Sequence, residues 1–136
     1  MFKRVLKNER GLTLIELLAV IVILGIVAAI AIPAIGGLIN KSKDDAKIAE
    51  GIQSINAAKL YMTANPPDTF PATLTKDQLD SYLDNVKDKG KDYEVEVKKD
   101  DKNGKYSYVL RKHDANDVLN DTELSETELQ NKRKEE

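Results

Sequence analysis

One carboxylate, that of Glu16, stands in an otherwise apolar stretch that runs from Gly11 to Ile39. A charged side chain is unfavourable in apolar surroundings, so such a residue normally pairs with an opposite charge. The segment from Leu17 to Ile39 contains no charge at all. The chemistry predicted here is therefore ion pairing, and the origin of the partner indicates what the segment does.

Residues that could carry catalysis are few. His113 is the single histidine, and it stands among Lys112, Asp114 and Asn116, which predicts an exposed side chain rather than a catalytic base. The chain has no cysteine, which excludes a disulfide, a thiol nucleophile and a thiolate metal site. A glycine-rich phosphate loop and a helical pair of metal ligands are also missing from the sequence. We therefore predict no catalytic residue, no cofactor, no metal and no enzyme activity.

The apolar segment is long enough to cross a membrane. Leu17 to Ile39 is 23 residues, which as a helix would span roughly 35 Å, against a hydrocarbon core of about 30 Å. A cleaved secretory signal is normally shorter and tolerates no acid at the position of Glu16. A plain single-pass anchor explains the length, and the bases of the leader (Lys3, Arg4, Lys7 and Arg10) place the N-terminus in the cytoplasm. That alternative leaves Glu16 unexplained.

The sequence from Gly11 to Glu16, GLTLIE, resembles the cleavage and methylation motif of type IV prepilins and pseudopilins. In that motif a short basic leader ends in Gly, an apolar residue follows, and Glu is fifth after the cut. Pro33 stands where those proteins carry a helix-kinking proline, twenty-second when counted from Leu12. Leu12 departs from the commonest residue of the family, which is Phe, although other apolar residues are accepted there. The resemblance covers about the first third of the chain.

The resemblance implies that a prepilin peptidase and methyltransferase cleaves after Gly11 and methylates the new amine of Leu12. It also implies that an inner-membrane assembly platform moves the subunit into a homo-oligomeric filament with other pilins. Cleavage creates an amine that Glu16 of a neighbouring subunit can pair with, and this pair would fix the axial register. In such filaments the helix often melts near the proline, here Gly25 to Pro33. A continuous, slightly bent helix is the alternative.

Beyond the apolar stretch, residues 40–64 are predicted to continue the helix in amphipathic form. Ile48, Ile52, Ile55 and Met62 recur on one stripe with Ala58 beside them, while charged residues cover the remainder. The sequence NPPD at 65–68 ends the helix, because neither proline can donate a backbone hydrogen bond.

Residues 65–120 predict a small α+β domain, pilin-like in that it packs against the long helix. Thr75 and Gln78 form the pattern of a capping box, with Leu74 and Leu79 as its hydrophobic staple, ahead of a short helix to about Val86. A polar segment with Gly90 then predicts a turn. Alternating residues predict two antiparallel strands, and the intervening Asp100 to Gly104 has the composition of a tight turn. Its acids lack the spacing of a calcium loop. The strand residues are Tyr93, Val95, Val97, Tyr106, Tyr108 and Leu110.

The last part of the chain leaves alternatives open. Val118 and Leu119 could add a short third strand or pack on the hairpin. In the polar tail, residues 121–136, the pattern around Leu124 and Leu129 could open a short terminal helix, and a frayed end is the other alternative.

Residues 40–136 carry 17 Lys and Arg against 21 Asp and Glu, a net charge of −4. This balance argues against direct nucleic-acid binding. The hypothesis favoured is a filament subunit, membrane-embedded with its N-terminus (the 1–11 leader) in the cytoplasm and the 12–39 helix in the bilayer, then extracellular after assembly. Alternatives are a pseudopilin of a competence or type II secretion-like system, and an uncleaved, membrane-anchored adhesin or sensor.

Overall fold

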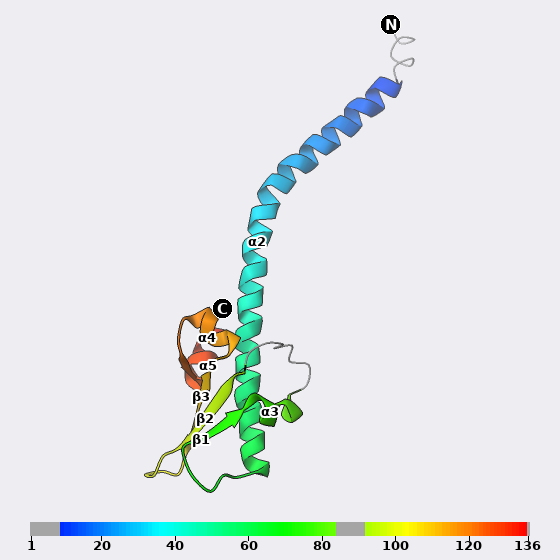
Figure 1. Ribbon diagram of the computed structural model, residues 1–136. Coiled ribbons are helices and arrows are strands. Elements are labelled where there is room, and N and C mark those ends of the chain that lie inside the picture. The colour runs from blue at the N-terminus through cyan, green and yellow to red at the C-terminus, as the bar shows by residue number, and fades with distance from the viewer. Residues whose placement is uncertain (1–8, 84–91, 136) are drawn as a thin grey trace. The chain divides into compact units, whose positions relative to one another are not determined.

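A computed structural model describes residues 9–83 and 92–135 (Figure 1). The first element of the described residues is one long helix, α2 (Glu9–Ala64). After it, the described residues form a small domain with four strands and four short helical segments. These are β1 (Ala72–Thr75), α3 (Lys76–Leu79), the 3-10 helix η1 (Asp80–Tyr82), β2 (Glu94–Lys99), β3 (Tyr106–Arg111), α4 (Asp114–Leu119), β4 (Glu123–Ser125) and α5 (Glu126–Lys134). The predicted α+β class is thereby confirmed.

The chain divides into two units, one ending at Lys41 and the other beginning at Ser42. In the first unit the described residues form only helix, and this helix continues through Pro33. The region from Gly25 to Gly37 is therefore helical throughout. Most of the leader, residues 1–8, lies outside the described residues.

In the second unit, α2 buries the stripe that the sequence predicts. Ile55 and Ala58 are fully buried, and Ile48, Ile52 and Met62 are nearly so. Ser54 lies among them, and its hydroxyl donates to the Glu50 carbonyl at 3.0 Å, which satisfies this polar group inside the core. This half of the helix is the spine on which the sheet packs.

The four strands form one antiparallel sheet in the order β1-β2-β3-β4. Val95 and Val97 face the core and are fully buried, as is Leu110 opposite Val95 on β3. The β2–β3 hairpin is the one predicted, and its turn is held by the Gly104 N–H, which donates to the Asp100 carbonyl at 2.8 Å. Gly104 has φ +68°, a conformation that glycine adopts without strain. Strand β1 was not predicted, because four residues give too short an alternation to recognise.

The capping box before α3 is confirmed: the Thr75 N–H donates to Gln78 Oε1 at 3.0 Å, and Leu74 and Leu79 are both buried. The helix is shorter than predicted, since α3 and η1 end at Tyr82, and the predicted continuation to Val86 and turn at Gly90 lie outside the described residues. The same pattern recurs at Ser125, which caps α5.

One alternative and one expectation for the last third of the domain are corrected. Of the two alternatives for Val118 and Leu119, the short third strand is wrong: they belong to helix α4 and pack partly buried against the core. The expectation that His113 is exposed is wrong, because its side chain has 0% exposure. Of the alternatives for the C-terminal segment, the short helix is present. Leu124 of β4 and Leu129 of α5 are buried in the core, which anchors this segment.

Candidate processing and assembly site

The three residues of the prepilin-like motif lie near the start of α2. Leu12 and Glu16 are four positions apart, so they share one face of the helix, about 6 Å apart along its axis. Leu12 is 50% exposed and the Glu16 side chain is exposed as well. Gly11 lowers the stability of the helix at this position by up to about 1 kcal/mol relative to alanine.

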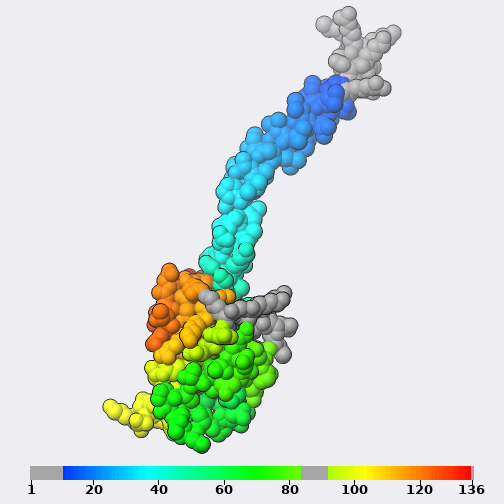
Figure 2. Space-filling model, viewed as in Figure 1, coloured from blue at the N-terminus to red at the C-terminus, as the bar shows by residue number. Residues whose placement is uncertain are grey.

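The apolar side chains that follow have no cover within the chain. From Leu12 to Ile39 the large apolar residues are between 48% and 73% exposed. This helix is long and apolar enough to cross a membrane, judged by length and composition. In the space-filling view (Figure 2) this part of α2, blue to cyan, is a bare rod of side chains. An apolar surface of this size is unfavourable in water, so lipid or other helices are expected to cover it.

Small residues interrupt this apolar surface. A Cβ placed on Gly25, Gly36 or Gly37 would meet no atom of the described chain within 4 Å. Such positions let a neighbouring helix approach closely in lipid or in a bundle. Pro33 lies between them and cannot donate a hydrogen bond to the carbonyl of residue 29, so the helix is locally weaker there.

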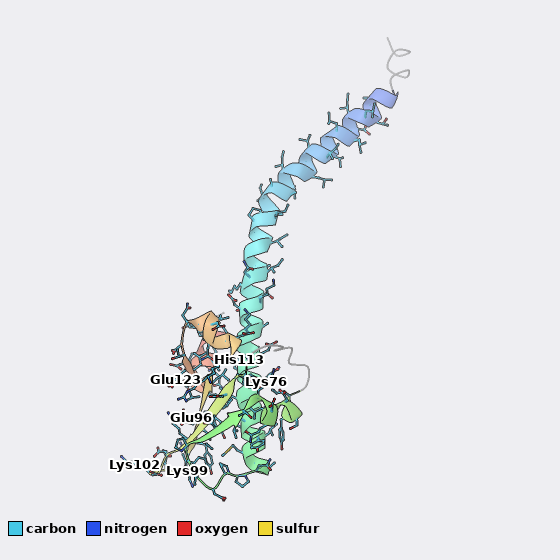
Figure 3. All side chains as sticks on the ribbon, in the orientation of Figure 1. Lys76, Glu96, Lys99, Lys102, His113 and Glu123 are labelled. Carbon is cyan, nitrogen blue, oxygen red and sulfur yellow. The ribbon has the colours of Figure 1, made fainter. Side chains whose placement is uncertain are left out.

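The second unit, which begins at Ser42, is called the outer domain from here on. In it a charged cluster joins three strands of the sheet. An Arg111 guanidinium nitrogen lies 2.5 Å from Glu96 of β2 and 2.6 Å from Glu123 of β4. Glu96 is only 9% exposed, more buried than the alternation had predicted, because Arg111 covers it. Figure 3 labels both carboxylates on the sheet. The cluster ties the C-terminal strand to the hairpin, and this role is structural.

The buried His113 is a helix cap. Its Nδ1 accepts the Ala115 N–H at 3.0 Å, and its backbone N–H donates to Asn116 Oδ1 at 3.0 Å. The ring packs edge-on against Tyr93, with the centroids 5.1 Å apart. Because Nδ1 accepts a hydrogen bond, the cap needs the neutral imidazole. The sequence signal was present, since His113 and Asn116 have the spacing of a capping box.

The hydroxyl of Tyr108, on strand β3, lies in a partly buried and negatively charged environment. Burial raises the pKa of its hydroxyl, and the negative charges of Glu126 and Tyr106 raise it further. Lys59 of α2 lies over the same ring, 5.6 Å from its centroid, and forms an ion pair with Glu126. Among the described residues no group of three or more His, Asp or Glu is placed to hold a metal ion.

Comparison with known proteins finds two matches to this chain. The family model described as the prokaryotic N-terminal methylation motif matches residues 6–32, the stretch that contains Gly11, Leu12 and Glu16. A fimbrial protein of Dichelobacter nodosus is 35% identical over 109 residues, which is 80% of this chain. Both matches support the type IV prepilin family for this chain. The aligned region spans 61% of the length of that relative, and no solved structure matches the chain.

The family model and the buried core involve different halves of α2. The methylation motif ends at residue 32, within the half whose side chains are exposed. The buried stripe from Ile48 to Met62 belongs instead to the core of the outer domain. The structure brings Leu12 and Glu16 onto one face of α2, whereas Pro33 lies between about four and six turns further along the helix.

Proposed function

We propose that this prepilin is the structural subunit of a type IV pilus-like filament. The observation that supports the proposal best is the methylation motif placed directly before an apolar helix that has no cover within the chain. A prepilin peptidase cleaves between Gly11 and Leu12, and the new amine of Leu12 is methylated. Before assembly the helix lies in the cell membrane with the N-terminus in the cytoplasm. The assembled filament lies outside the cell.

In the filament the exposed apolar helices cover one another, and Glu16 pairs with the Leu12 amine of a neighbouring subunit. A buried charge without a partner costs several kcal/mol, so the pair selects the one axial register in which both charges are satisfied. The uncleaved chain lacks this amine, which makes assembly dependent on processing. Pro33 supplies a kink in the packed helices.

The substitution Glu16→Ala tests the pairing. It should abolish filaments, or lower their yield by at least roughly tenfold, and leave cleavage after Gly11 intact. Sheared filaments are quantified by immunoblot, and cleavage is read from the mobility of the cell-associated chain. Asp44→Ala is the matched control, because it removes an exposed acid of the same helix outside the apolar stretch. Normal filaments from Glu16→Ala would refute the pairing.

N-terminal sequencing of the mature protein separates the proposal from an uncleaved membrane-anchored adhesin or sensor. A methylated Leu12 at the N-terminus supports the filament subunit, and an intact Met1 rules it out. A pseudopilin of a competence or secretion system shares the processing, so the length of the filaments on cells is the measurement that distinguishes it.

A further inference from the structure

The turn of the β2–β3 hairpin is a basic projection on a domain whose net charge is negative. Residues 98–105 carry four lysines, all exposed, and two aspartates. Figure 2 shows this hairpin, in yellow, standing out from the rest of the domain, and Figure 3 labels Lys99 and Lys102 on it. The lysines are Lys98, Lys99, Lys102 and Lys105.

The hairpin is also held in one conformation. The Asp100 carboxylate accepts the Lys102 N–H at 2.9 Å, and the Asn103 side chain accepts the Lys105 N–H at 2.9 Å. The Asp100 N–H donates to the Lys105 carbonyl at 2.9 Å. A turn fixed by these bonds presents its lysine side chains with little further loss of backbone entropy on binding.

The other end of the same sheet is acidic. Strand β3 leads away from the hairpin to Arg111, so α4 lies at the far end of the β2–β3 ladder, about 20 Å from the turn. An open cleft of about 400 Å³ lies there, and Asp117 and Asp121 are both exposed in it. Among the described residues that line it, the cation is Lys112, which is paired with Glu94 at 3.1 Å. The described lining residues are Lys112, Asn116, Asp117, Asn120, Asp121 and Thr122.

We infer that the lysine hairpin of one subunit docks into the acidic cleft beside α4 of a second copy of this chain. The two surfaces differ in sign and lie at opposite ends of one domain. A contact between them is therefore head-to-tail and repeats from copy to copy, as an open filament requires. The C-terminal end of α4, which carries partial negative charge, adds to the attraction for a lysine. This inference rests on the proposed filament function and adds an outer contact to the helical core.

Cross-linking tests the contact, because the natural chain contains no cysteine. Filaments of the full chain with both Lys102→Cys and Asp121→Cys are oxidised and run on a non-reducing gel. The head-to-tail contact predicts a ladder of covalent multimers, since each subunit then bonds to two neighbours. Either substitution alone should give monomers. The pair Lys102→Cys and Thr73→Cys is the control, with the second cysteine exposed on strand β1.

Charge reversal gives the second measurement. At low ionic strength Lys102→Glu should lower the filament yield roughly tenfold, and Lys102→Glu combined with Asp121→Lys should restore it. A ladder in the Lys102 and Asp121 pair together with this restoration supports the contact. Filaments without a ladder in that pair, an equal ladder in the control pair, or a normal yield from Lys102→Glu overturns it and leaves the filament function standing. Failure of the unaltered chain to form filaments would instead refute the proposed function.

Discussion

The two halves of α2 belong to one continuous helix, yet their side chains meet opposite conditions. In the first half, Leu24 is 59% exposed and its apolar neighbours are exposed to a similar fraction. This apolar surface is available to contact lipid or other helices. In the second half, Ile55 and Ala58 have no exposure at all. The comparison teaches that helix formation and burial are separate properties here. The first half is specified by a few residues at fixed positions, and the second by the spacing of its apolar stripe.

The difference between the two halves can be tested by shortening one leucine in the core of the outer domain and one leucine in the exposed half of α2. Leu110→Ala opens a cavity in the core on which the second half of α2 packs, and it should destabilise the outer domain by about 2–5 kcal/mol. Leu24→Ala removes an equal volume from the exposed half and should leave domain stability unchanged. Both are measured on the full chain in detergent by urea unfolding, with tyrosine fluorescence as the signal. Equal losses in the two variants would show that the halves are not independent.

A smaller effect is expected at the glycines of the two halves. A Cβ on Gly51 would lie 3.1 Å from both Ala115 Cβ and Leu110 Cδ2, which is closer than normal contact. Gly51→Val should therefore destabilise the domain by about 1–3 kcal/mol through overpacking. Gly25→Val is the matched control, because a Cβ on Gly25 would meet no described atom within 4 Å. We expect no change for it in the same urea unfolding experiment. Unchanged stability in Gly51→Val would contradict the close packing of α2 on the sheet.

The sequence predicts most of the fold where a pattern is local. The stripe from Ile48 to Met62, the Asn103-Gly104 hairpin and the Thr75 capping box each follow from residues within one or two turns of one another. Strand β1 could not be predicted in this way, because it exists through pairing with Val95 and Val97 on a distant strand. The burial of His113 was missed because Asn116, one of the polar neighbours that suggested exposure, is itself buried and accepts the His113 N–H. The ring nitrogen Nδ1 is satisfied by the Ala115 N–H of α4.

The site was predictable to a different degree. Gly11, Leu12 and Glu16 could be proposed from the sequence because their spacing matches a motif that is read from sequence directly, and their roles stay a prediction. The charged ends of the outer domain were not found, since they depend on which end of the sheet each segment reaches. Gly51 was overlooked for the same reason: only the packing of α2 on Ala115 and Leu110 reveals why a glycine stands in that helix.

The smallest expected effect concerns Tyr108, on the strand that packs against the buried half of α2. Its pKa is raised in the folded protein, by burial first and by Glu126 and Tyr106 after that, while an unfolded tyrosine has a pKa of about 10. Above that value the unfolded chain loses its proton before the folded chain does. The contribution of Tyr108 is thus fully present below about pH 10 and is lost as the pH rises through the folded-state value.

Urea unfolding between about pH 9 and pH 11 should show a steeper loss of stability in the natural chain than in Tyr108→Phe. All other residues are the same in both chains, so their contributions cancel in the difference. If the stability of the two chains fell equally with pH, the Tyr108 hydroxyl would have the same surroundings in the folded and unfolded states, and the raised pKa would be contradicted.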